Sequence, residues 1–281
     1  MKKISNKLFL CIAASSLLFT SCYKKFDTES YAPPFTISGF SSVSQIQPTA
    51  LVGYWSFDGN LLDSVSGTAG VNTETTFVPG FKGQAMQGGI GKYVLFTPGA
   101  TIKALHSFTL SYWVNTPPPS VGIIGTVSLS NPTAFWGNID VFYENGGTNA
   151  AGKFRAHISN GPNDKEIPKD GMLNLFSSWT NITLSYDGAT STSKIYKDGN
   201  LVDTKVQTNG AAPFGNVDFT NSGQMVFGCN QFMTTPSLTS AHGAEGWASF
   251  LTGQLDEVRM YSTVLLDKEV NAMVILQGKG K

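Results

Sequence analysis

The chain has 281 residues, of which 19 are Lys or Arg and 19 are Asp or Glu, so its formal net charge at neutral pH is zero. This balance argues against a nucleic-acid partner, because binding to phosphates usually requires an excess of basic residues. Charged residues make up only 14% of the sequence, 30 residues are glycine, and runs with a helical period are nearly absent. The composition therefore predicts an all-β, extracytoplasmic domain with many turns.

The first residues have the pattern of an export signal. Lysines precede the apolar run Leu8–Phe19, which is too short to span a bilayer. The run leads into Thr20-Ser21-Cys22, which resembles a bacterial lipobox, where small residues precede a cysteine that becomes lipidated. We therefore expect a signal peptide over residues 1–21, a lipid on Cys22, and a location at the bacterial cell envelope, on the periplasmic or surface face of the outer membrane. An ordinary secretory signal cut nearby is the alternative.

Residues 22–50 are expected to form a flexible tether between the lipid and the domain, because they are polar, aperiodic and interrupted by prolines. Cys11 leaves with the signal and Cys22 carries the lipid, so Cys229 is the one thiol expected in the folded domain. It follows a buried-strand pattern, which predicts an inert buried thiol and no intramolecular disulfide.

The predicted domain covers residues 51–281, and its alternating or apolar segments are typical of short strands. In chain order, the first two strands are expected at Leu51–Phe57 and Val71–Phe77, and residues 81–86 lead into a third. The next are expected at Tyr93–Phe96, Phe108–Val114, Val121–Leu129, Ile139–Tyr143 and Phe154–Ile158. The later strands are expected at Trp179–Tyr186, Lys194–Tyr196, Leu201–Lys205, Met225–Cys229 and Leu251–Tyr261. One helix is expected at Asp267–Gln277, capped by Asp267. This pattern predicts two packed antiparallel sheets with a short C-terminal helix.

The last predicted strand carries an unusual mixture of charged and apolar side chains. Strict alternation puts Leu255 on one face with Glu257, and Asp256 on the other face with Val258. A carboxylate beside apolar residues needs a partner. We expect Asp256 to meet the Asp58-Gly59-Asn60 turn, so that the two ends of the domain close the fold.

Four motifs together resemble the laminin-G-like jelly roll of the concanavalin A-like lectin/glucanase superfamily. In chain order they begin at Leu51, Phe81, Ile195 and Gly253, and they read LVGYWSFDGNLLDS, FKGQA, IYKDGNLV and GQLDEVRMY. The resemblance extends from about Leu51 to about Met273, and it implies a two-sheet antiparallel jelly-roll sandwich.

The same superfamily includes glycoside hydrolases, which need two carboxylates about 5 Å apart in the retaining enzymes. The related glucanases take these carboxylates from alternate positions of one strand. Here the corresponding stretch has Gln254 and Val258 at those positions, and Asp164 and Glu166 are expected in a loop. The three histidines are scattered and no Gly-x-Ser-x-Gly motif occurs, so we expect no catalytic residues.

The resemblance also implies a structural calcium ion at the edge of a sheet, where the early turn meets the late aspartate. It nominates Asp58, Asn60, Asp63 and Asp256 as ligands, since calcium prefers carboxylate and amide oxygens. The alternative is that Asp58 and Asp63 form turn hydrogen bonds and that Asp256 pairs with a backbone donor or an arginine.

Sugar binding is the usual soluble role of this family, and it requires an exposed aromatic platform with polar neighbours. We expect Trp136, Asn138, Tyr143 and Trp247 to contact a ligand, because all four are expected near loops and the two tryptophans follow turn-rich stretches. Core packing is the alternative for each aromatic residue. The sequence thus favours a membrane-anchored, non-catalytic protein that recognises a glycan or polysaccharide. The alternatives are a protein-binding adhesion or assembly module and a diverged glycoside hydrolase.

Overall fold

A computed structural model describes residues 35–281, and residues 36–281 form one compact unit. The predicted signal peptide and Cys22 lie outside the described residues. Within the described part, no helix is long and apolar enough to cross a membrane.

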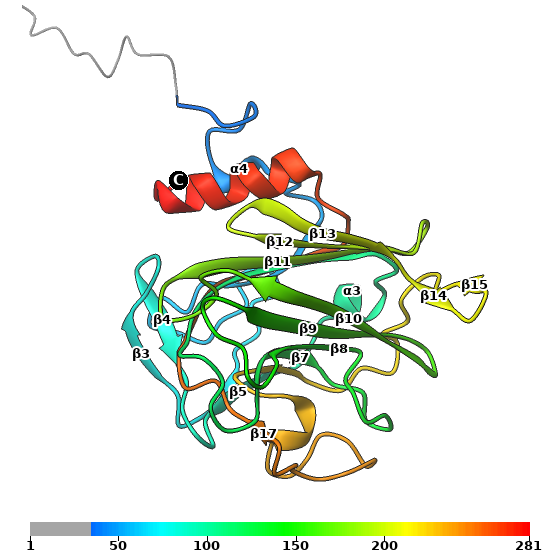
Figure 1. Ribbon diagram of the computed structural model, residues 1–281. Coiled ribbons are helices and arrows are strands. Elements are labelled where there is room, and N and C mark those ends of the chain that lie inside the picture. Colours follow the sequence, from blue (N-terminus) through cyan, green and yellow to red (C-terminus); the bar gives the residue numbers. More distant parts are fainter. Residues whose placement is uncertain (1–34) are drawn as a thin grey trace, which may run out of the picture. The chain divides into compact units, whose positions relative to one another are not determined.

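The unit is built from two antiparallel sheets of eight strands each (Figure 1). The first sheet has the order β13 (Asn200–Val206), β12 (Thr192–Lys197), β11 (Thr180–Asp187), β6 (Phe108–Asn115), β18 (Gln254–Tyr261), β4 (Gln84–Gln87) and β3 (Thr76–Pro79), with β1 (Leu51–Trp55) also paired to β18. The second has the order β10 (Asn163–Met172), β9 (Gly152–Asn160), β8 (Ile139–Tyr143), β7 (Ile123–Leu129), β16 (Met225–Phe227), β5 (Tyr93–Phe96) and β2 (Val71–Thr73), with β17 (Ala248–Ser249) added in parallel to β7.

Short elements connect or cover these sheets. They are the 3-10 helices η2 (Val43–Gln45) and η3 (Gln231–Met233), the helices α3 (Ala100–Lys103) and α4 (Asp267–Gly278), and the hairpin of β14 (Thr208–Asn209) with β15 (Ala212–Pro213). The all-β sandwich with one C-terminal helix is as the sequence predicted.

The core lies between the two sheets. Alternate residues of the central strands point into it, including Leu110, Tyr112 and Val114 of β6, which are all fully buried. Trp55 packs edge-on against Phe96 and Phe227 of the second sheet, with ring centroids 5.7 and 5.1 Å apart. These aromatic contacts bridge the two layers.

The two ends of the domain meet as expected, because β1 pairs antiparallel with β18 and places Trp55 opposite Val258. The expected alternation along β18 is wrong, however. A β-bulge interrupts the register after Asp256, and Glu257 adopts a left-handed backbone with φ of 51°. The extra residue moves Leu255 to the core side, together with Val258.

Helix α4 covers the outer face of the first sheet and packs on Tyr196 and Tyr261 (Figure 1). The N-cap of this helix is Leu266 and not Asp267 as expected, so the helix begins at Asp267 itself. The Glu269 side chain accepts a hydrogen bond from the backbone N–H of Leu266 and so stabilises this start. Val43 and Ile46 are buried in the same cluster. The compact unit therefore includes residues 36–50, for which the sequence predicts a flexible tether.

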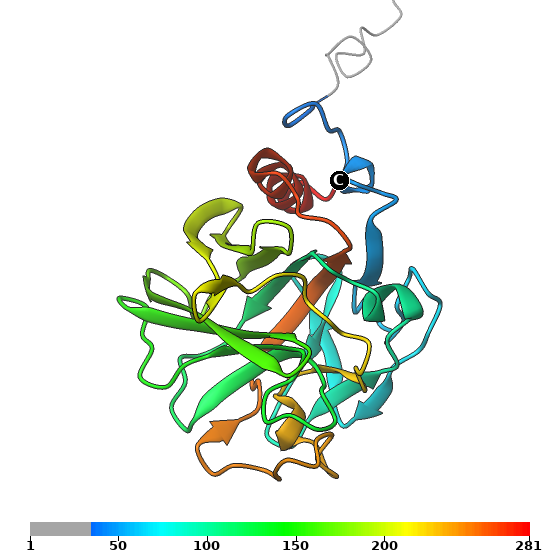
Figure 2. The ribbon, with the colours of Figure 1, turned by 90° about the vertical axis from the view of Figure 1, so that its right-hand side faces the viewer.

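Residues 228–253 form a long loop that lies on the outer face of the second sheet, and we call it the covering loop. It contains η3 and β17 and appears in gold and orange at the bottom of Figure 2. A second apolar cluster fills the space beneath it, with Phe142, Phe232 and the buried free thiol of Cys229. Burial raises the pKa of this thiol well above its usual value, as expected for an inert residue.

Candidate functional site

An open pocket of about 300 Å³ lies beside the covering loop on the outer face of the second sheet. We call it the aromatic pocket. Its lining consists of Ile123, Trp136, Phe142, Glu144, His157, Glu166 and Trp247. The strands β7 to β10 supply its floor, since Phe142, His157 and Glu166 come from β8, β9 and β10. Trp136 and Trp247 reach it from two loops that are far apart in the sequence.

Trp136 forms the wall of the aromatic pocket that rests on the sheet. Its ring is stacked on His157, with centroids 4.1 Å apart, and on Phe142 at 5.2 Å, in both cases almost parallel. The Trp247 ring is tilted relative to Trp136 with its centroid 6.2 Å away, and the Trp247 side chain is 42% exposed. The two indoles thus make a partly exposed, angled aromatic surface.

Residues 130–138, which we call the Trp136 loop, are held tightly over the sheet. Gly137 is required there, because a Cβ at this position would lie within 2.8 Å of the carbonyl oxygens of Leu129 and Ile139. The buried Asp140 carboxylate accepts a hydrogen bond from the Gly137 N–H, and burial raises its pKa. Asn138 is buried as well and bonds to Ser159. These contacts fix the ring of Trp136 indirectly.

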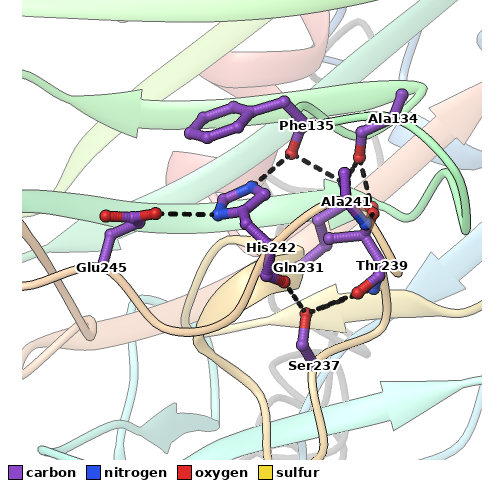
Figure 3. Close-up of polar contacts among 8 residues, drawn as sticks. All are labelled: Ala134, Phe135, Gln231, Ser237, Thr239, Ala241, His242 and Glu245. Carbon is purple, nitrogen blue, oxygen red and sulfur yellow. Dashed lines mark hydrogen bonds and ion pairs between the residues drawn. The ribbon is translucent and has the colours of Figure 1, made fainter.

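The covering loop is fastened to the Trp136 loop by a cluster of polar contacts, drawn in Figure 3. The His242 ring is stacked on Phe135 at 3.6 Å, its Nε2 lies 3.2 Å from the Phe135 carbonyl oxygen, and its Nδ1 lies 3.1 Å from Glu245 Oε1 (Figure 3). Gln231, also in the covering loop, donates hydrogen bonds to the carbonyl oxygens of Ala134 and Phe135 in the Trp136 loop. The two loops therefore hold Trp136 and Trp247 in a fixed relation.

Two glutamates form the polar side of the aromatic pocket, and one arginine lies between them. Arg155 Nε is 3.1 Å from Glu166 Oε1 and 4.0 Å from Glu144 Oε2. Next to them, His157 Nδ1 is 2.8 Å from Asp164 Oδ2. The sequence prediction missed this side of the pocket, since Asp164 and Glu166 lie on strand β10 and not in a loop.

The structure brings together two of the four residues that we expected to contact a ligand. Trp136 and Trp247 share the aromatic pocket. Asn138 and Tyr143 are both fully buried and do not line it. Tyr143 points into the core against Phe176, because it alternates along β8 with the outward-facing Phe142. That alternation was the signal that could have identified Phe142.

The four residues expected to bind calcium do not form one cluster. Both carboxylate oxygens of Asp63 accept hydrogen bonds from its own turn, including the N–H groups of Val65 and Ser66. Asn60 likewise accepts the Leu62 N–H. Among the described residues, no group of three or more His, Cys, Asp or Glu side chains could hold a metal ion.

Asp58 and Asp256 do converge, on the turn at residues 80–84. Asp58 accepts the Gln84 N–H at 2.8 Å and Asp256 accepts the Lys82 N–H at 3.0 Å. The second oxygen of Asp256 is buried and has no hydrogen-bond partner. Burial, with a smaller contribution from the charges of Glu257 and Asp58, raises the pKa of Asp256 to about 7. Calcium stays a prediction, and of the four nominated residues only Asp58 and Asp256 meet at one turn.

A larger cavity of about 490 Å³ lies between the edge strands β10 and β13. Its described lining includes Lys169, Leu173 and Lys197 but no aromatic side chain. It therefore lacks the platform on which a sugar ring could stack, and the aromatic pocket is the better candidate for a ligand site.

Solved structures share this fold at low sequence identity. The binding domain of botulinum neurotoxin serotype C1 gives a TM-score of 0.58 at 14% identity, covering 83% of this chain and 53% of that chain. Domain 4 of AbnA, an extracellular arabinanase from Geobacillus stearothermophilus in complex with arabinotriose, gives 0.53 at 16%, covering 80% and 98%. A sialidase from Trypanosoma rangeli gives 0.55 at 14%, covering 83% and 33%.

The chain thus spans about half the length of the neurotoxin binding domains that it resembles. A comparison with curated proteins gave no match. Residues 87–271 match the family model of the concanavalin A-like lectin/glucanases superfamily. This range includes strands β7 to β10, which form the floor of the aromatic pocket.

Proposed function

Because this chain belongs to the concanavalin A-like lectin/glucanases superfamily, we propose that it is a non-catalytic carbohydrate-binding protein, held at a bacterial envelope surface by a lipid on Cys22. One observation carries the binding proposal. Trp136 and Trp247 come from loops more than a hundred residues apart, yet their rings meet in one open pocket with polar neighbours.

This arrangement suits a sugar ring for physical reasons. Sugars present C–H groups on their faces and hydroxyl groups at their edges, so a flat indole and nearby carboxylates satisfy both. The volume of the aromatic pocket, about 300 Å³, is at the lower end of the range for ligand sites and suits one or two sugar units. Two structural neighbours also bind sugars: domain 4 of AbnA is in complex with arabinotriose, and botulinum neurotoxin type C interacts with two ganglioside molecules.

Binding of oligosaccharides to the purified protein, by glycan array followed by calorimetry, tests the proposal. Trp247→Ala should weaken binding at least about tenfold, because truncating an aromatic anchor usually costs more than 1.4 kcal/mol. Leu173→Ala removes a large apolar side chain, 62% exposed against 42% for Trp247, from the other cavity and is the control. Unchanged binding in Trp247→Ala, or a loss in Leu173→Ala, would refute the assignment to the aromatic pocket.

A glycoside hydrolase is the second candidate, because Glu144 and Glu166 line the same pocket. Retaining and inverting hydrolysis both need one carboxyl group of the pair to be protonated. Here both carboxylates are already engaged by the guanidinium of Arg155, whose Nε lies 3.1 Å from Glu166 and 4.0 Å from Glu144. Release of reducing ends from polysaccharides by the wild-type protein, and its loss in Glu166→Gln, would establish the enzyme instead.

A further inference from the structure

The outer face of strand β10 carries a row of acidic side chains next to the aromatic pocket. Asp164, Glu166 and Asp170 alternate along the strand and are all exposed by at least 42% of their side-chain surface. Glu144, at the end of β8, adds a fourth carboxylate to the same region. The polar side of the pocket is therefore acidic.

Three permanently charged side chains, Arg155, Lys153 and Lys169, stand near these four carboxylates, and of the three only Arg155 contacts the two glutamates that line the pocket. One guanidinium, that of Arg155, contacts Glu144, Glu166 and Asp170, and its side chain is only 13% exposed. The imidazole of His157 contacts Asp164. Lys153 and Lys169 act on Asp170, at the far end of the row.

No lysine or arginine is found in the described lining of the aromatic pocket, whereas two carboxylates and three large aromatic rings are. Aromatic faces attract cations through their quadrupole, and carboxylates attract them directly. An ammonium group entering the pocket meets both kinds of partner. A carboxylate on a sugar would instead meet the like charges of Glu144 and Glu166.

On the premise that the pocket binds a glycan, we propose that it selects amino sugars with a free ammonium group and rejects acidic sugars. The stacking surface of Trp136 and Trp247 supplies general affinity, and Glu144 and Glu166 determine the class of sugar. Arg155 is a positioning residue, because it holds the two glutamates at the rim of the pocket.

The test compares three tetrasaccharides with the same β-1,4 linkage, which differ only at C2: glucosamine, N-acetylglucosamine and glucose. At about pH 6 the amine of the first is protonated, and we expect it to bind about tenfold more tightly than the glucose tetramer. This preference should fall as salt is raised from about 0.02 to 0.5 M, because exposed charges are screened. A tetramer of galacturonic acid should bind more weakly than the neutral tetramers.

Two variants identify the residues responsible. Glu166→Gln and Glu144→Gln should each reduce the preference for the amine, measured in the same variant as the ratio of the affinities for the glucosamine and glucose tetramers, about threefold or more. Glu74→Gln, in the turn beside β2 at the opposite edge of the sheet, is the matched control and should not change this ratio.

The outcomes separate this inference from the proposed function. If all tetramers bind, lose affinity in Trp247→Ala, and show no amine preference, the pocket binds glycans but the selectivity is refuted. If the glucosamine tetramer binds equally well to wild type and Trp247→Ala, the glycan site itself is refuted. An amine preference that survives both glutamate variants would assign the selectivity to other residues and overturn the inference.

Discussion

Replacing Asp256 by asparagine should stabilise the metal-free protein at neutral and alkaline pH. Asp256 is fully buried, its Oδ2 accepts the Lys82 N–H, and its Oδ1 has no hydrogen-bond partner. Burial is the main reason that its pKa is raised to about 7 in the folded protein, compared with 3.8 for an exposed aspartate. Asparagine keeps an oxygen for the Lys82 N–H and removes the charge.

Proton linkage shows why the Asp256 carboxyl lowers the free energy of unfolding as the pH rises. Below about pH 4 both the folded and the unfolded chains hold the proton, so Asp256 does not penalise folding. Between about pH 4 and 7 the unfolded chain releases the proton while the folded chain retains it, and the free energy of unfolding falls by about 1.4 kcal/mol per pH unit. The total loss above pH 7 is on the order of 4 kcal/mol, which is an upper bound for this site.

The net gain in Asp256→Asn is smaller, because its amide group occupies the position that lacks a partner. An unsatisfied buried donor costs about 1–3 kcal/mol, so the variant should be more stable than wild type by about 1–3 kcal/mol at pH 8. Urea unfolding with a chelator present, followed by tryptophan fluorescence between pH 5 and 8, measures this difference. Parallel pH profiles for the two proteins would refute the reasoning.

Bound calcium should reverse this order of stability, so wild type and Asp256→Asn together also test whether calcium binds. A bound cation favours the charged carboxylate, so added calcium should raise the melting temperature of wild type and not that of Asp256→Asn. No change in either protein would remove the calcium prediction.

Three further predictions concern other parts of the molecule. Gly80→Ala should lower the free energy of unfolding in urea by about 2 kcal/mol, because the alanine Cβ would lie 2.6 Å from Asp256 Oδ2. A decrease below about 0.5 kcal/mol would contradict this contact. His242→Ala should loosen the covering loop, so that its amides exchange hydrogen faster and glycan affinity falls, while unchanged exchange would show that His242 does not fasten the loop. Cys22→Ser should move the protein from the membrane fraction to the soluble fraction of cells, and retention in the membrane would exclude the lipid anchor.

The central strands were predictable because their periods are strong. Ile139–Tyr143 and Tyr93–Phe96 match the expected bounds, since buried strands combine alternation with β-branched and aromatic residues. Strand β10 was missed because it lies at the edge of its sheet and exposes charged side chains such as Asp164 and Glu166. Its turn at Gly161, with φ of 58°, was the local signal for a hairpin.

The site was only half predictable, because long-range contacts create it. Turn-rich sequence around Trp136 and Trp247 suggested exposed aromatics, but nothing local relates the two loops that carry them. Their alignment depends on His242 and Gln231, which bond to residues about a hundred positions earlier. The bulge at Glu257 has no sequence signal either, since a glutamate with positive φ is uncommon.

The placement of helix α4 determines how the molecule can be oriented. The helix and the segment beginning at Thr36 lie against one sheet, whereas the aromatic pocket opens on the outer side of the other sheet. The described chain therefore enters the compact unit at Thr36 on the side opposite the pocket, and an attachment at this point would act from that side. A molecule fixed in this way would direct its two indoles outward, away from the supporting surface, where long polymers can reach them without bending around the domain.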